Sequence, residues 1–290
     1  MICRAETRAD LEAYAVCWGA VWPDAVSVEF ILERIAHEPE RLYLNAFEGD
    51  RVVGTGVVAR SSRRGYRPVA VAVLPDWRGH GLGSELLERC LDHARSLDAV
   101  HALSFVREDD HDSVAFVRRR GFEILDRVVS LAIDLEPGVE APPPAGGIEI
   151  AELDEAHREE AFEIYAQGVV DMPTAAPLDP GTFEDWLAEI ELHPLTLVAL
   201  DGNRVVGYAD LEVRNGPAGI LGNGMTAVRR AHRGRGIGEA LKRAQIAWAA
   251  ASGYSQLTTS THADNEAMRR LNEKLGYREL PALLDVSRPL

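Results

Sequence analysis

The sequence has 290 residues, of which 46% are hydrophobic and 27% are charged, which suits one large or two medium globular domains. Its net charge of −15 argues against nucleic acid or an anionic membrane as a partner. No uncharged apolar run is long enough to span a bilayer, and the charged N-terminus shows no signal peptide. Three cysteines without metal-site spacing favour a reducing compartment and buried thiols. We therefore expect a cytoplasmic protein without a metal site.

The first half predicts helices and strands in alternation. Apolar residues recur at helical spacing between Asp10 and His37, with a break at Pro23-Asp24. Residues 42–47 and 51–58 read as the two strands of a hairpin around the turn at 48–50. Strands are then expected over 69–74, 100–106 and 122–134, and helices over 84–97 and 113–120.

A segment without periodicity, residues 136–147, is rich in Pro and Gly and reads as a linker. Beyond it the same order of elements returns. Strands are expected over 148–150, 256–261 and 277–285, a hairpin over 196–213, and helices over 155–170, 182–191, 239–252 and 265–275. We therefore divide the chain into domains 1–135 and 148–290, joined by the linker.

One motif, Arg-x-x-Gly-x-Gly, occurs in both halves. Arg78, Gly81 and Gly83 recur 155 positions later as Arg233, Gly236 and Gly238. Each copy follows an apolar strand and precedes a helix. Such a turn leaves backbone N–H groups aimed outward at the positive end of a helix, which predicts a phosphate-binding loop.

The order of elements and the loop resemble those of the GNAT superfamily of acyl-CoA N-acyltransferases. In the first half the matching residues are Val73, Arg78, Gly81, Gly83, Ser84 and Gly121-Phe122. In the second half they are Val228, Arg233, Gly236, Gly238, Asn265 and Gly276-Tyr277. The resemblance implies an α+β fold of two tandem GNAT units, each a mixed, mostly antiparallel twisted sheet flanked by helices.

The resemblance also implies acetyl-CoA, or another acyl-CoA, as the cofactor. Backbone N–H groups from Arg233 to Gly238 would hold its pyrophosphate, and the backbone of Val228 would bond its pantetheine arm. In the second half the implied cofactor residues are Ala227, Val228, Arg233, Gly234, Arg235, Gly236, Ile237, Gly238, Asn265, Met268 and Asn272. In the first half they are Val73, Arg78, Gly79, Gly81, Gly83 and Ser84.

The chemistry implied is direct attack by an amine on the thioester, with alignment, an oxyanion-stabilising N–H and two proton transfers. Many family members carry a Tyr acid seven residues after the Asn. Here those positions hold Asn272 and Val117, which leaves Tyr208 or Tyr254 as candidate acids. As base we consider Asp210 or Glu212.

Asp171 and Pro173 lie in the loop where the family builds its acceptor pocket, whereas His193-Pro194 reads as a turn. In the first half Asp110 replaces Asn265. We therefore expect the second half to be catalytic, and the first to be structural or a second cofactor-binding unit.

The leading hypothesis is an N-acetyltransferase that acts on a primary amine of a small acceptor, with the acidic charge balance favouring a cationic one. The alternative is a non-catalytic acyl-CoA-binding or interaction protein, favoured by the missing Tyr in both halves. A dinucleotide-binding oxidoreductase is rejected because the motif is not Gly-x-Gly-x-x-Gly after the first strand.

Overall fold

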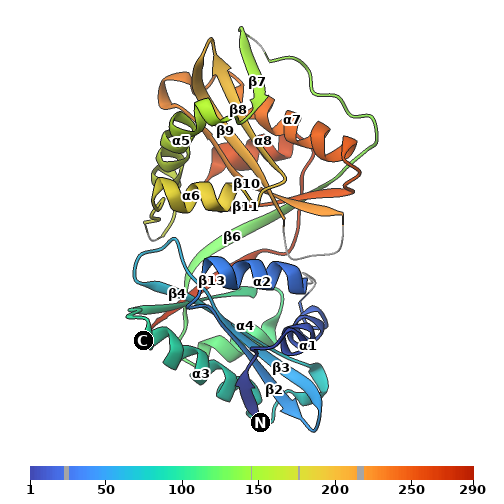
Figure 1. Ribbon diagram of the computed structural model, residues 1–290, viewed down its shortest axis with the longest axis vertical. Coiled ribbons are helices and arrows are strands. Elements are labelled where there is room, and N and C mark those ends of the chain that lie inside the picture. The colour runs from blue at the N-terminus through green and yellow to red at the C-terminus, as the bar shows by residue number, and fades with distance from the viewer. Residues whose placement is uncertain (23–25, 145, 176, 214–218) are drawn as a thin grey trace. The chain divides into compact units, whose positions relative to one another are not determined.

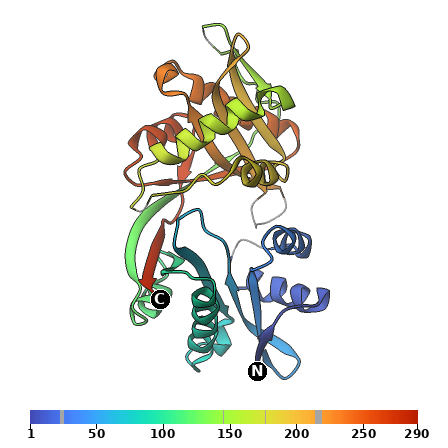
Figure 2. The ribbon, with the colours of Figure 1, turned by 60° about the vertical axis from the view of Figure 1, so that its left-hand side comes forward.

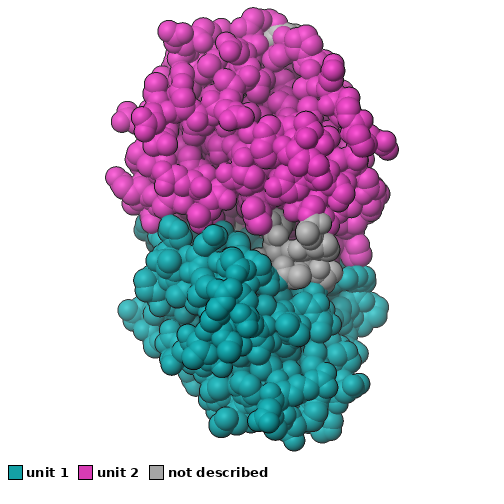
Figure 3. All heavy atoms as spheres, turned by 45° about the vertical axis from the view of Figure 1, so that its right-hand side comes forward, with its two compact units in different colours: residues 1–126, 215–217, 284–290 teal, residues 127–214, 218–283 magenta. Residues whose placement is uncertain are grey.

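The structure is a computed structural model of residues 1–290, and it describes all of them except 23–25, 145, 176 and 214–218 (Figure 1). The predicted break at Pro23-Asp24 lies outside the described residues. Figure 3 colours the two compact units into which the chain divides. Unit 1 contains residues 1–126 and 284–290, and unit 2 contains the described part of 127–283.

Unit 1 is one sheet between two pairs of helices. The strand order is β1 (Ile2–Arg4), β2 (Leu42–Glu48), β3 (Arg51–Val58), β4 (Tyr66–Val73), β5 (His101–Arg107) and β13 (Leu283–Pro289). Helices α1 (Arg8–Gly19) and α2 (Val28–His37) cover one face. The other face carries α3 (Leu82–Ser96) and α4 (His111–Arg118). Figure 2 shows α1 and α2 in blue and α3 in teal on opposite sides of the strands.

Unit 2 repeats this arrangement. Its strand order is β6 (Glu123–Asp134), β11 (Gln256–His262), β10 (Ile220–Val228), β9 (Arg204–Val213), β8 (Leu195–Asp201) and β7 (Ile148–Glu152), with β12 (Arg278–Glu279) beside β6. Helices α5 (Arg158–Asp171) and α6 (Phe183–Ile190) cover one face. Helices α7 (Ile237–Ala251) and α8 (Glu266–Lys274) cover the other. The predicted fold class, a mixed sheet flanked by helices in two copies, is confirmed.

The units do not coincide with the predicted domains 1–135 and 148–290, because each unit contains the last strand of the other half. The C-terminal strand β13 belongs to unit 1, where Leu284 and Val286 join the core. Between them Asp285 forms an ion pair of 2.9 Å with Arg63, and both side chains are buried. In unit 2, β6 pairs with β11 from Val128 to Asp134. The pattern of apolar residues predicts strands but does not say in which sheet a strand pairs.

The last predicted strand, 277–285, is two strands in the structure, β12 and β13, with residues 280–282 between them. Pro281 lies in this break, and proline lacks the N–H that a ladder needs. Residues 136–147 form no helix or strand among those described, as expected of a linker. No helix in the described part of the chain is long and apolar enough to cross a bilayer.

In each unit one parallel strand pair ends early, and this positions the site. Strands β4 and β5 pair over Tyr66–Pro68 and His101–Leu103. Strands β10 and β11 pair over Ile220–Gly222 and Gln256–Thr258. The strand that diverges then runs into the Arg-x-x-Gly-x-Gly loop, so that loop and diverging strands share one end of the sheet.

Candidate active site

Both copies of the glycine-rich loop have the same backbone. The φ angles are 80° and 87° at Gly79 and Gly81, and 76° and 78° at Gly234 and Gly236, values that glycine adopts far more readily than other residues. A Cβ on any of the four would meet no atom within 4 Å. Helices α3 and α7 begin at the next residue. The loops therefore present helix N-termini to open space, as a phosphate-binding loop requires.

The first arginine of the motif fastens the loop to the preceding strand. Arg78 Nε donates to the carbonyl of Val73 at 3.0 Å, and Arg233 Nε donates to the carbonyl of Val228 at 3.0 Å. This contact explains why the arginine lies five residues after the end of the strand in both copies.

In unit 2 the loop arginines have acidic partners. Arg230 and Arg233 both donate to the carboxylate of Asp171 at the end of α5. The hydrogen bond from Arg230, together with that from Arg233, lowers the pKa of Asp171 to about 2. Asp171, predicted to line an acceptor pocket, therefore lies against the loop arginines, while Pro173 is exposed just beyond α5.

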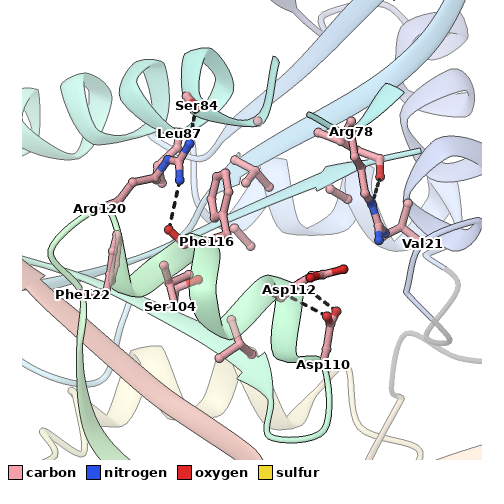
Figure 4. Close-up of a pocket in the computed structure, with 18 of the residues that line it drawn as sticks. Val21, Arg78, Ser84, Leu87, Ser104, Asp110, Asp112, Phe116, Arg120 and Phe122 are labelled. Atoms are coloured by element: carbon pink, nitrogen blue, oxygen red, sulfur yellow. Dashed lines mark hydrogen bonds between the residues drawn. The ribbon is translucent and has the colours of Figure 1, made fainter. Parts of the chain in front are cut away.

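A cavity of about 920 Å³ lies in unit 1 where β4 and β5 diverge (Figure 4). It extends from the loop at Arg78 and Gly81 along β4 to Val21 and Trp22, which follow α1. Figure 4 shows Arg120 reaching from the end of α4 to Ser84, to which it donates. Its guanidinium also lies 3.6 Å from the centroid of the Phe116 ring. The volume suits a small-molecule or cofactor site, and it lies in the half that the sequence predicted to be structural or cofactor-binding.

The corresponding strand of unit 2 contains a β-bulge that unit 1 lacks. Asp210 on β9 faces two residues of β10, Gly224 and Met225, because the register shifts between Asn223 and Thr226. The carboxylate of Asp210 accepts a hydrogen bond of 3.0 Å from the N–H of Met225. In unit 1, β3 and β4 pair without a shift, and the position of Asp210 is occupied by Val57. Bulges of this kind are frequent beside active sites.

A histidine completes this cluster. His193 follows α6, and its Nδ1 lies 3.0 Å from Asp210 Oδ2, as an ion pair whose angles do not form an aligned hydrogen bond. Burial by itself would lower the pKa of His193, but Asp210 and Glu189, with a contribution from Glu212, raise it to about 9. The imidazole is therefore charged at neutral pH although its side chain is 8% exposed.

The sequence profile of the acetyltransferase (GNAT) family matches residues 10–122 and 151–277. The chain belongs to the GNAT family. The two matched segments confirm the two predicted GNAT units. A relative, the N-alpha-acetyltransferase RimI of Mycobacterium tuberculosis, is 31% identical over 122 residues, which are 41% of this chain and 72% of the relative.

Solved GNAT structures have the same fold over the whole chain. A GCN5-related N-acetyltransferase from Sphaerobacter thermophilus has a TM-score of 0.78 and 23% identity, covering 100% of this chain and 95% of its own. A tandem GNAT protein from the clavulanic acid biosynthesis pathway has a TM-score of 0.78 and 16% identity, covering 100% and 98%.

The three catalytic residues predicted for this GNAT protein lie on one face of β9. Asp210 is 3% exposed, Tyr208 is 1% exposed and Glu212 is half-buried. Burial, with the charge of Asp210, raises the pKa of Tyr208 well above its usual range. Tyr208 packs against Trp186 and Tyr165 with ring centroids 6.0 and 5.8 Å away, whereas Tyr254 stacks on Trp248 in the other core.

The predicted cofactor residues of α8 differ in their surroundings. Asn265 is the N-cap of the helix, and its side chain accepts from the N–H of Met268 at 3.3 Å. Asp110 caps α4 of unit 1 in the same way, with 3.0 Å to the N–H of Ser113. Asn272 is wholly buried. Ala227 and Ile237 are buried, Val228, Met268 and Gly238 are half-buried, and Arg233, Gly234, Arg235 and Gly236 are exposed. Their roles toward a cofactor stay predictions.

Sequence reasoning missed two buried ionisable residues of unit 2, His193 and Lys242. His193-Pro194 was expected to be a turn, and residues 191–194 do form turns and bends, but the imidazole faces Asp210. A residue-by-residue comparison of the two halves would have found Lys242, since it stands 155 positions after Leu87.

Proposed function

We propose that the protein is an acetyl-CoA-dependent N-acetyltransferase and that acetyl transfer takes place in unit 2. The observation that carries this proposal is the β-bulge of β10, where Asp210 meets the N–H of Met225 and the imidazole of His193. Titratable groups with shifted pKa values gather at functional sites. The exposed loop from Arg233 to Gly236 follows the same strand, starting five residues after its end at Val228.

In this proposal acetyl-CoA supplies the acetyl thioester and the loop of unit 2 holds its pyrophosphate. Acetyl transfer to an amine needs one group that removes a proton and one that supplies a proton. Glu212, half-buried on the face of Asp210, is the proposed base. His193 is the proposed proton donor, because its pKa of about 9 lies close to the value of about 8.5 that is usual for a thiol.

In this proposal Asp210 takes no proton itself and contributes to acetyl transfer by positioning its neighbours. Its carboxylate keeps His193 charged and holds the bulged strand through Met225. The acceptor in this proposal is a primary amine of a small molecule. The net charge of −15 favours a cationic acceptor, since unlike charges assist encounter.

A second function, acyl-CoA binding without chemistry, is supported for unit 1. Its cavity of about 920 Å³ adjoins the loop of Arg78, but Val57 occupies the position of Asp210. Unit 1 therefore offers a phosphate loop and a cavity, and an aliphatic side chain where unit 2 has a carboxylate.

The test is release of free thiol from acetyl-CoA in the presence of a panel of small primary amines. We expect turnover in the wild type and at least a tenfold loss in Asp210→Asn. The control is Asp134→Asn, which removes an exposed carboxylate far along the sequence from the bulge. Binding of acetyl-CoA without thiol release on any amine would contradict the proposal and favour a non-catalytic acyl-CoA-binding protein.

A further inference from the structure

Lys242 and Asn272 are among the buried polar side chains of unit 2 that lack hydrogen-bond partners. Lys242 on α7 is 1% exposed and Asn272 on α8 is 0% exposed. Neither the ammonium nitrogen of Lys242 nor either amide atom of Asn272 has a hydrogen-bond partner within the described part of the chain. Lysine is almost never fully buried unless it is paired, and unsatisfied buried polar groups are rare in native structures.

Their positions match the wall of the cavity in unit 1. With the offset of 155 that relates the two loops, Lys242 and Asn272 correspond to Leu87 and Val117. Both of those residues line the cavity where β4 and β5 diverge. Strands β10 and β11 stop pairing at the corresponding place, Gly222 and Thr258. Lys242 and Asn272 therefore belong to the equivalent wall in unit 2.

The same comparison shows that most positions of this wall are more polar in unit 2. Three further cavity-lining residues of unit 1, Ser104, Val106 and Phe122, correspond to Thr259, Thr261 and Tyr277, all buried. One repeat thus lines this region with mainly apolar side chains, and the other lines it with hydroxyl, amide and amine groups.

Other polar groups nearby satisfy one another. The Tyr277 hydroxyl donates to Asn223 Oδ1 at 2.6 Å, and the amide of Asn223 donates to Gln245 Oε1 at 2.9 Å. Gln245 in turn donates to the carbonyl of Asp210 at 2.7 Å. Lys242 lies beside this chain with its nitrogen 5.2 Å from the Tyr277 ring centroid. The amine of Lys242 therefore lies beside satisfied polar groups but has no anionic partner among the described residues.

We propose that the interior of unit 2 binds a small organic carboxylate through Lys242 and Asn272. A carboxylate accepts hydrogen bonds from both an ammonium and an amide N–H, and a buried cation without a partner is stabilised by an anion. Burial lowers the pKa of Lys242 to about 7, so that a bound carboxylate would also draw a proton onto the amine.

Where the carboxylate is the end of a dicarboxylic acyl-CoA, this inference rests on the proposed function and changes its donor: the loop, the bulge and the transfer to an amine stay as proposed, and that acyl-CoA takes the place of acetyl-CoA. The carboxylate of a free small carboxylic acid would bind to Lys242 and Asn272 in the same way. The same experiment distinguishes the free acid from the acyl-CoA. Leucine and valine occupy these positions in unit 1, and they therefore give matched replacements, Lys242→Leu and Asn272→Val.

The test is calorimetric titration of the full chain with succinyl-CoA, acetyl-CoA and free succinate at pH 8 in buffers of different ionisation enthalpy. In the wild type we expect succinyl-CoA to bind at least tenfold more tightly than acetyl-CoA, with proton uptake, and Lys242→Leu to remove both the preference and the uptake. If free succinate binds to the wild type and not to Lys242→Leu, the ligand is the free acid. Asn272→Val reduces the preference in part, and it replaces Lys242→Leu if that variant fails to fold.

Equal binding of succinyl-CoA and acetyl-CoA together with no binding of succinate would overturn the inference, as would a preference that survives in Lys242→Leu. The titration needs no turnover. Carboxylate binding can therefore be disproved while thiol release from acetyl-CoA supports the proposed function. Carboxylate binding can likewise be observed when no thiol is released.

Discussion

The carboxylate of Asp210 lies directly against the backbone of Gly224, so that a Cβ on Gly224 would be 2.1 Å from Asp210 Oδ2. The bulge, the glycine and the carboxylate thus depend on one another. Without the extra residue in β10 the carboxylate would have no room beside the strand, and without the glycine it could not approach the N–H of Met225.

Gly224→Ala should therefore destabilise the protein and slow acetyl transfer together. A distance of 2.1 Å is far below contact, and the forced shift of backbone or carboxylate should cost about 1–3 kcal/mol. Thermal unfolding and thiol release measure the two effects. The matched control for stability is Gly238→Ala, where the nearest atom would be 3.7 Å away within a helix. An unchanged melting temperature in Gly224→Ala would contradict this account of the bulge.

Asp210→Asn should lower the pKa of His193 from about 9, since burial, which lowers this pKa, would then be opposed only by Glu189 and Glu212. In the wild type the raised pKa contributes stability that is fully present below about pH 6.5 and is lost as the pH rises through about 9. The variant should lack this contribution. NMR titration of the histidines gives the pKa, and denaturant unfolding at pH 6 and pH 9.5 gives the stability. A His193 pKa that stays near 9 in the variant would assign the shift to Glu189 and Glu212 instead.

Lys242→Leu should stabilise unit 2 at pH 7 and remove a dependence of stability on pH. The folded pKa of about 7 lies below the usual 10.5, so the unfolded chain binds more protons between these values. Wild-type stability contributed by this group therefore rises from pH 7 to about 10.5. The gain from leucine should be largest at pH 7 and smaller at pH 10, as measured by denaturant unfolding. A variant less stable than the wild type at both pH values would contradict an unpaired amine.

Removing the buried partner of Arg63 should destabilise unit 1. Asp285 lies 2.9 Å from that guanidinium, and both side chains are buried. Asp285→Ala leaves an uncompensated buried charge, at a cost of about 3–5 kcal/mol. The double variant Arg63→Met with Asp285→Leu should recover most of this loss in the same unfolding assay. Failure to recover would point to the other contacts of Asp285.

Blocking the two loops separately should reveal how many acyl-CoA molecules bind. Glutamate at Gly81 or Gly236 brings a negative charge to a position with positive φ, which opposes both the backbone and the phosphate. Calorimetry should count two molecules per wild-type chain and one in Gly81→Glu or in Gly236→Glu. Thiol release should survive in Gly81→Glu and be lost in Gly236→Glu. The opposite result would transfer the chemistry to unit 1.

Local pattern predicted most of the fold. The periodicity of Leu86, Leu87, Cys90 and Leu91 predicts α3, and the repeated loop predicts a second unit like the first. Strand pairing over long sequence distances was not predictable, because β6 and β13 carry no local mark of the sheet they join. The β-bulge in β10 could not be predicted for a related reason. Gly224 looks like any glycine in a strand until Asp210 is placed opposite it.

In the site, too, features with a local sequence signature could be predicted and features set by distant residues could not. The loops were predicted because glycines with positive φ leave a sequence signature, whereas burial decides the chemistry of His193 and Lys242. A lone histidine before a proline and a lysine in an amphipathic helix both resemble solvated side chains in the sequence. Their surroundings come from residues far along the chain, namely Asp210 for the first and Tyr277 for the second.

The exchanged strands have a consequence for anyone who wishes to dissect the protein. A gene fragment that stops within the Pro-rich segment encodes a first sheet without β13 and adds β6, whose ladder partner β11 is missing. We expect such fragments to be insoluble when produced alone and to recover structure by complementation when produced together. The boundary that the sequence suggests is thus unsuitable for cloning either repeat by itself.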